Sequence, residues 1–229
     1  MKLIQGHEDI PLNGAGLRTA QNVALHLRDR VINRVYASPL QRVTRTVDVI
    51  VEEQNRHRLA HGQGIEPMQL EHDRRLMGQG MGVLTGRPYQ DSDFHHPTTS
   101  DRFAGVEKYA DFLARLDSFL EHMLLVEAQW AKYAKRYNHA APPGRRGECS
   151  QTDTVLVAGH GVAIRHLIAR LLRFGGWRDQ EIDSVLPQFY PIGRTAEVTV
   201  RHIDQLPVSH GAVQWQVLRH RPLSVWIAG

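Results

Sequence analysis

A strand passes directly into a helix at residues 152–172, TDTVLVAGHGVAIRHLIARLL, and this junction limits the folds open to the chain. Residues 155–158 are an apolar run, Gly159-His160-Gly161 is a glycine turn, and apolar residues then recur with the helical period. In open α/β sheets, ligands bind at the carboxyl ends of strands, where helix N-termini attract anions. We therefore predict an α/β fold with His160 at a ligand-binding edge. The alternative is a histidine that caps the helix or fills the core.

A second strand–helix unit lies earlier in the chain. Residues 32–37 predict a short strand that ends at Ser38-Pro39, interpreted as a helix start with Ser38 as cap and Pro39 in the first turn. Arg42 follows one turn into that helix, so its side chain can return to the strand end. Because parallel strands end at one edge, Arg42 and His160 should converge there, and this pair suits a phosphate group. The alternative for Arg42 is a solvated surface arginine.

The remaining segments complete a single predicted domain over residues 1–229. A helix at about residues 15–30 precedes the first strand, and the helix after Ser38-Pro39 should reach about residue 55. We predict a strand at 66–70, a glycine-rich loop over the site at 76–89, a helical insertion at about 105–138 and a surface loop at 138–151. Residues 196–203 and 213–219 alternate like an antiparallel ribbon.

The composition excludes several classes of protein. The net charge is +4, and with lysine at four positions, 24 of the 28 basic residues are arginine; these are scattered, so nucleic-acid binding is not favoured. Cys149 is the single cysteine, and His95-His96 has no partner at a metal-ligand spacing, so we expect neither a disulfide nor a metal site. The chain shows no signal segment and no membrane-spanning run, which favours a cytoplasmic protein.

Four stretches in the same order resemble one known family. Residues 36–46 (YASPLQRVTRT) and 154–165 (TVLVAGHGVAIR) are similar to two motifs of the histidine phosphatase superfamily, the phosphoglycerate-mutase-like proteins. Residues 4–16 (IQGHEDIPLNGAG) resemble the family's substrate loop, and residues 105–119 resemble a further segment, with Glu107, Asp111 and Arg115 in register.

The resemblance implies a fold and a site. The family fold is a three-layer α/β structure, a sheet with helices on both faces. Carried over to matching positions, His160 stands for the family's second catalytic histidine and Arg42 for its second phosphate-binding arginine. Gly161 would supply a backbone amide, and Gln5-Gly6 would touch the substrate. The implied ligand is phosphate or a phosphorylated small molecule, with no cofactor and no metal.

Two family features have no counterpart in this sequence. The nucleophilic histidine belongs to an Arg-His-Gly motif that ends the first, central strand, and this strand would precede Ile4. Arg-His pairs such as those at 165–166, 201–202 and 219–220 are not followed by glycine, so we exclude a circular permutation. The family's acid aligns with Gly78, with Glu71 and Asp73 as nearby alternatives. We therefore expect the first central strand to be missing.

These departures leave two functional hypotheses. The first is a catalytically inactive phosphate-binding or structural module. The second is an active phosphomonoesterase or phosphomutase whose start lies upstream of Met1. A strand missing from the middle of a sheet leaves buried backbone groups unpaired at about 1–3 kcal/mol each. A handful of these rivals the ~5–15 kcal/mol stability of a domain. Either the strand therefore lies upstream of Met1, or another chain fills the slot, such as a partner chain or a second copy of this chain.

Overall fold

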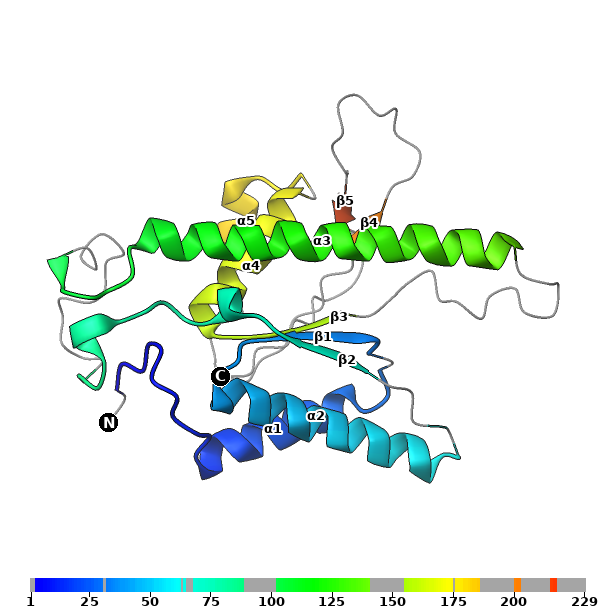
Figure 1. Cartoon of the computed structure of the whole chain (residues 1–229), viewed down its shortest axis with the longest axis horizontal. Coiled ribbons are helices and arrows are strands. Elements are labelled where there is room, and N and C mark those ends of the chain that lie inside the picture. Colours follow the sequence, from blue (N-terminus) through cyan, green and yellow to red (C-terminus); the bar gives the residue numbers. More distant parts are fainter. Residues whose placement is uncertain are drawn as a thin grey trace.

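The computed structural model describes residues 3–30, 32–62, 64, 68–88, 102–140, 155–174, 176–185, 200–202 and 215–217. They form an α/β fold built on a small parallel sheet (Figure 1). Its strands are β1 (Arg34–Ala37), β2 (Gln69–His72) and β3 (Val155–Ala158), with a separate pair β4 (Val200–His202) and β5 (Trp215–Val217). The helices are α1 (Gly14–Leu27), α2 (Gln41–Ala60), α3 (Tyr109–Ala140), α4 (Gly161–Phe174), α5 (Asp179–Val185) and the short 3-10 turns η1 (Arg74–Leu76) and η2 (Gly82–Leu84).

The three parallel strands have the order β2-β1-β3. In their register, Ala37 at the end of β1 lies opposite His72 of β2 and Ala158 of β3. All three strands therefore end at one level, and the residues that follow them emerge side by side. β4 and β5 pair antiparallel, which confirms the predicted terminal ribbon over shorter ranges.

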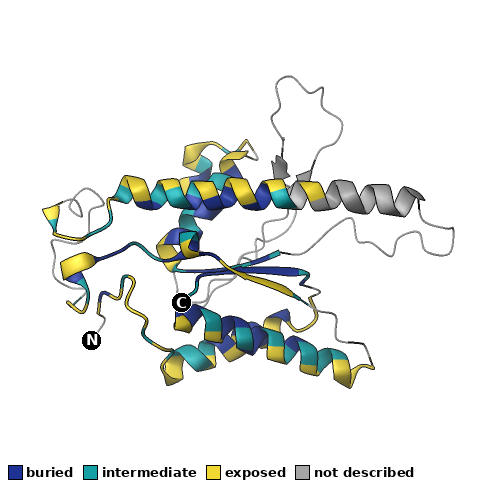
Figure 2. Ribbon diagram, viewed as in Figure 1, coloured by how far each residue is buried: buried dark blue, intermediate teal, exposed yellow. Residues whose placement is uncertain are grey.

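Helices cover both faces of the sheet, as Figure 1 shows: α1 and α2 lie on one face, and α3, α4 and α5 on the other. The pleat distributes the strand residues between two cores. Val35 and Ala37 pack with α1 and α2, whereas Tyr36 packs with α3 and α4. β1 is buried along its length, while all four residues of the edge strand β2 are exposed (Figure 2). This arrangement matches the three layers expected from the sequence.

Element boundaries differ from the predictions at several places. The Ser38 cap is wrong: α2 begins at Gln41, and the Gln41 N–H is accepted by the carboxylate of Asp9 (2.6 Å). Pro39 consequently precedes the helix. α2 also runs on to Ala60, α1 ends at Leu27, and the second strand lies at 69–72. α5 was not predicted. Residues 141–150 of the predicted surface loop lie outside the described residues.

The long helix α3 begins at Tyr109 and packs on α4 through Phe112, Leu116, Phe119 and Leu120, which are all buried. Its partner α4 carries the predicted apolar face, and His166 of α4 binds the Asp117 carboxylate of α3 (2.7 Å). The Arg-His pair at 165–166 therefore lies within a helix and not at a strand end. In the described part of the chain, no helix combines the length and apolarity needed to cross a membrane.

A buried amide joins the two helices on the other face. Gln54 of α2 is 1% exposed, and its Nε2 donates to the carbonyl oxygens of Leu27 (3.1 Å) and Arg30 (2.8 Å) just where α1 ends. The Leu27 carbonyl also accepts from the Arg30 N–H (2.8 Å), so Gln54 adds a second donor there and supplies a side-chain donor to the Arg30 carbonyl.

We expect Gln54→Met, which keeps the volume but removes both donors, to lower the free energy of unfolding by about 1–3 kcal/mol. Urea denaturation measures this. The exposed Gln21 of α1 gives the matched control, because Gln21→Met should change stability by less than about 0.5 kcal/mol. Equal effects of the two substitutions would contradict the capping role of Gln54.

Candidate functional site

The shared level of the strand ends brings His160 beside Ser38. The Ser38 N–H donates to the Ala158 carbonyl (3.0 Å), which continues the β1–β3 ladder by one residue. The His160 Nε2 lies 3.0 Å from the Ser38 Oγ, just beyond the end of β1. The His160 carbonyl accepts the first hydrogen bond of α4, from the Ile164 N–H (2.9 Å). His160 thus opens the helix with its backbone and faces the sheet edge with its side chain.

Arg42 reaches the same place from the first turn of α2. Its Nη2 lies 3.4 Å from the His160 Nδ1, so the two residues predicted to converge are in contact. Arg42 is only 5% exposed, because the N-terminal loop covers it. Its Nη1 and Nη2 donate to the carbonyl oxygens of Glu8 (2.8 Å) and Gly6 (3.1 Å). The guanidinium therefore holds the loop of residues 5–9 against the site.

These contacts fix the protonation of His160. A guanidinium can only donate, so the Nδ1 that faces it accepts, and the hydrogen is on Nε2, which donates to Ser38. Burial lowers the pKa of His160 to about 3, and the charge of Arg42, followed by those of His7 and Arg115, acts in the same direction. His160 is therefore a neutral imidazole throughout the physiological range.

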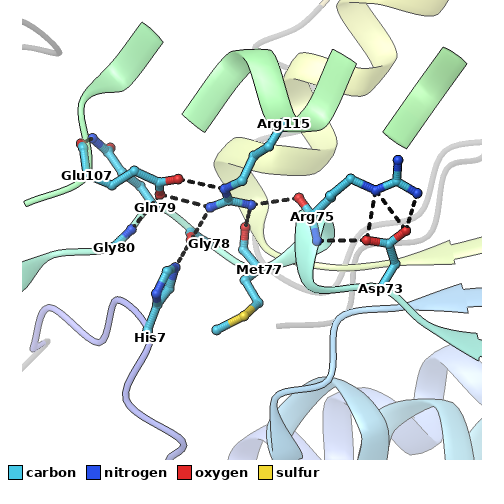
Figure 3. A network of polar contacts seen from close by, with 9 residues as sticks. All are labelled: His7, Asp73, Arg75, Met77, Gly78, Gln79, Gly80, Glu107 and Arg115. Carbon is cyan, nitrogen blue, oxygen red and sulfur yellow. Dashed lines mark hydrogen bonds and ion pairs between the residues drawn. The ribbon is translucent and has the colours of Figure 1, made fainter. Parts of the chain in front are cut away.

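Arg115 of α3 holds the loop that follows β2 (Figure 3). Its Nη1 donates to the carbonyl oxygens of Arg75 (2.6 Å) and Met77 (2.8 Å), and its Nη2 to that of Gly78 (2.7 Å). The same guanidinium holds the Glu107 carboxylate through Nε (2.6 Å) and Nη2 (2.9 Å). One planar fork thus holds three carbonyls and a carboxylate in one arrangement.

The carboxylates of Glu107 and Asp73 each bind an arginine, Arg115 and Arg75 respectively. Burial raises the pKa of Glu107, but hydrogen bonds from Arg115 and the Gly80 N–H outweigh it, so the pKa is lowered overall. Asp73 behaves alike: burial raises its pKa, and the contacts from Arg75 lower it further than burial raises it. Both groups are therefore ionised near neutral pH and hold structure.

A second histidine enters the site from the N-terminal loop. The His7 Nε2 lies 2.7 Å from the Gly78 carbonyl oxygen, and Figure 3 shows the ring directed at the 78–80 segment. A Cβ on Gly78 would lie 3.4 Å from the His160 Cγ. Both imidazoles therefore lie next to Gly78.

The other predicted residues are Gly6, Gln5 and Gly161. Gly6 has a φ of +52°, and a Cβ there would come within 2.8 Å of Met81, so the loop can take this path only with glycine. The Gln5 side chain is exposed. Gly161 opens α4 with open space beside its Cα, and the N–H groups of a first helical turn lack intrahelical acceptors.

Three residues that contact His160 or Gly78 are not predicted by the sequence motifs. The sequence predicts a helix cap at Ser38, places His7 in the substrate-loop match and gives Arg115 a motif position without a role. The signal for Ser38 was present, since it immediately follows a strand. The contacts of His7 and Arg115 join segments 71 and 37 residues apart, respectively, and no local pattern encodes them.

No group of three or more metal-ligating side chains occurs within the described ranges. His95-His96 lies outside them.

The chain belongs to the histidine phosphatase superfamily (branch 1), whose sequence model matches residues 1–185. A relative from Arabidopsis thaliana, phosphoglycerate mutase-like protein 4, is 26% identical over 169 residues, which are 73% of this chain and 63% of that protein. The chain thus spans less than two thirds of the length of this relative.

Two solved structures share the fold. One, described as mycobacterial hydrolase 1, aligns with a TM-score of 0.59 at 20% identity over 98% of this chain and 90% of that one. The other is a mycobacterial glucosyl-3-phosphoglycerate phosphatase in complex with inorganic phosphate, with a TM-score of 0.54 at 19% identity over 97% and 90% of the two chains.

The buried neutral His160 makes stability fall on acidification. The pKa of His160 is about 3 in the folded protein and near 6.5 in the unfolded chain, so the unfolded state binds the proton at a higher pH. As the pH drops from about 6.5 towards 3, protonation therefore stabilises the unfolded state relative to the folded state. We expect His160→Gln to remove up to about 1.4 kcal/mol per pH unit of this slope. Urea denaturation of both proteins at several pH values measures the difference, and parallel profiles would contradict it.

We expect Arg115→Met to destabilise the protein by about 3 kcal/mol, because it leaves the Glu107 carboxylate and three carbonyls without their donor. Arg115→Lys should recover little of this loss, since a single ammonium cannot reproduce the planar fork. Thermal unfolding of the two variants tests the point. Full recovery by lysine would show that charge alone matters.

Proposed function

We propose that the 229-residue chain binds the phosphoryl group of a small molecule through Arg42 and His160, with the Gly161 amide and the Gln5-Gly6 loop at the rim. We propose further that it performs no phosphohistidine turnover and serves as a binding or structural module. The contact between Arg42 and His160 at the carboxyl edge of the sheet is the observation that carries the binding proposal.

The chemistry of the site supports an anion ligand. A guanidinium has five N–H donors, and the three contacts of Arg42 leave donors for phosphate oxygens. His160 is neutral and places no fixed charge there, so Arg42 provides the attraction, strengthened by its burial. The start of α4 adds backbone N–H groups beside His160. The phosphate complex of the mycobacterial relative fits this reading.

The environment of Gly78 supports the absence of turnover. The position aligned with the family's acid is next to the His160 ring, and there it offers no side chain. The two alternative acids are unsuitable, since Asp73 is ionised and bound to Arg75, and Glu71 is exposed on β2. Proton donation to a leaving group needs an acid that holds its proton near neutral pH, which the ionised Asp73 does not provide.

The alternative is an active phosphomonoesterase or phosphomutase in which the strand that carries the nucleophilic histidine is added beside β3. The sheet supports it: among the described residues, β3 pairs with β1 alone, which leaves its other side for a further strand. That strand would come from sequence joined upstream, from a partner chain, or from a second copy of this chain. Under this alternative Arg42 and His160 keep the same phosphate-holding role.

Turnover distinguishes the two candidates. We expect the 229-residue chain, incubated with an aryl phosphate such as p-nitrophenyl phosphate, to release product no faster than a His160→Ala control. Acid-quenched protein should carry no covalent phosphate. Turnover that His160→Ala abolishes would sink the proposal of inactivity and support the active alternative.

Binding is tested separately, by the rise in melting temperature with inorganic phosphate. We expect Arg42→Gln to abolish the rise, measured from its own baseline, because the substitution removes the buried cation. The exposed Arg45 of α2 gives the matched control, since its guanidinium pairs with Glu52 and Arg45→Gln should keep the full rise. An undiminished rise in Arg42→Gln would contradict the proposed site.

A further inference from the structure

The N-terminal loop brings two carboxylates close to the buried guanidinium of Arg42. The Glu8 carbonyl oxygen accepts from the Arg42 Nη1 (2.8 Å), so the Glu8 side chain begins beside this cation. Asp9 follows directly in the chain. Hydrogen bonds from Gln41 lower the pKa of Asp9, and the charge of Arg42 acts in the same direction. The side chains of Glu8 and Asp9 are both exposed, so a solute that approaches Arg42 from solvent meets their negative charge.

These two charges are not cancelled by an ion-pair contact. The Asp9 carboxylate binds the backbone N–H (2.6 Å) and the side-chain amide (3.0 Å) of Gln41, and both donors are neutral. Within the described ranges, no cation contacts the Glu8 carboxylate. Glu107 differs, because its carboxylate forms an ion pair with Arg115 (2.6 Å). Glu8 and Asp9 therefore add two negative charges to the loop that covers the phosphate site.

The two parts of a phosphate ester would respond differently to this loop. The phosphoryl oxygens are held at contact distance by charge-assisted hydrogen bonds from Arg42. Arg42 is 5% exposed, so the organic part of the ligand must lie on the solvent side, where Glu8 and Asp9 are exposed. Repulsion between like charges acts over about 8 Å at physiological ionic strength and needs neither contact nor a particular side-chain direction.

We propose that Glu8 and Asp9 determine the class of ligand, selecting phosphate esters of neutral or cationic alcohols over phosphorylated carboxylic acids. The proposal rests on the phosphate site proposed above and adds the charge of the organic part that this site accepts. A carboxylate on the ligand would be repelled by the loop, whereas an ammonium group would be attracted to it.

Three esters of similar size isolate the charge of the organic part: ethyl phosphate is neutral there, phosphoethanolamine is positive and phosphoglycolate is negative. Isothermal titration of the 229-residue protein at about pH 8 keeps the phosphate groups doubly charged and ordinary histidines neutral. Glu8→Gln removes one charge and retains the backbone carbonyl that holds Arg42. Glu121→Gln is the matched control, because Glu121 is exposed on α3, across the sheet from α2 (Figure 1).

We expect wild type and Glu121→Gln to bind ethyl phosphate about tenfold more tightly than phosphoglycolate, and phosphoethanolamine at least as tightly as ethyl phosphate. Glu8→Gln should reduce the tenfold ratio to about threefold. Raising the salt concentration from about 0.05 M to about 0.5 M should reduce it in wild type as well, because salt screens exposed charges.

Equal affinities of wild type for ethyl phosphate and phosphoglycolate would overturn the charge selection and leave the phosphate site standing. A ratio that neither Glu8→Gln nor salt changes would also overturn it, because shape and not charge would then discriminate between the esters. Wild type that binds none of the three esters would refute the phosphate site itself, and the selection with it.

Discussion

The common end level of β1, β2 and β3 is the constraint on which the rest of the site depends. Because Ala37 and Ala158 are paired in register, Ser38 follows one strand beside the turn that follows the other, and the His160 ring meets its hydroxyl. A slip of one residue would turn every side chain of a strand to the opposite face and would separate Tyr36 from its core. The two hydrophobic cores therefore position the polar site as well as stabilise the fold.

Arg115 fixes the arrangement of the loop after β2, as the strand register fixes the strand ends. The segment after β2 has no regular backbone pairing to hold its carbonyls, and a planar cation with several donors orders them together. Its counter-ion Glu107 also binds the Gly80 N–H, so residues 75–80 are held at both ends by one ion pair. The electrostatic cost of burying this pair is offset by these hydrogen bonds.

The sequence predicts the structure correctly where it depends only on a strand and the helix that follows it. The junction at His160 and the convergence with Arg42 follow from apolar runs, glycines and the geometry of parallel sheets. Local sequence patterns mispredict the structure where a distant segment overrides a local preference. Ser38 is a good cap by type, yet α2 starts at Gln41 because the carboxylate of Asp9, 32 residues earlier, reaches its N–H. The place of His7 depends likewise on the path of the loop, which is fixed by the close approach of Gly6 to Met81.

The bonds that hold residues 5–9 have a consequence for motion. This segment has no regular secondary structure and is fastened by the Asp9 cap, the two Arg42 donors and the His7 contact. Such a segment can detach in a local opening whose free energy is set by these few bonds, well below that of global unfolding. Amide hydrogens at the start of α2 should then exchange with solvent water independently of those in the centre of the helix. The N-terminal loop would thus set the rate at which the buried arginine meets solutes.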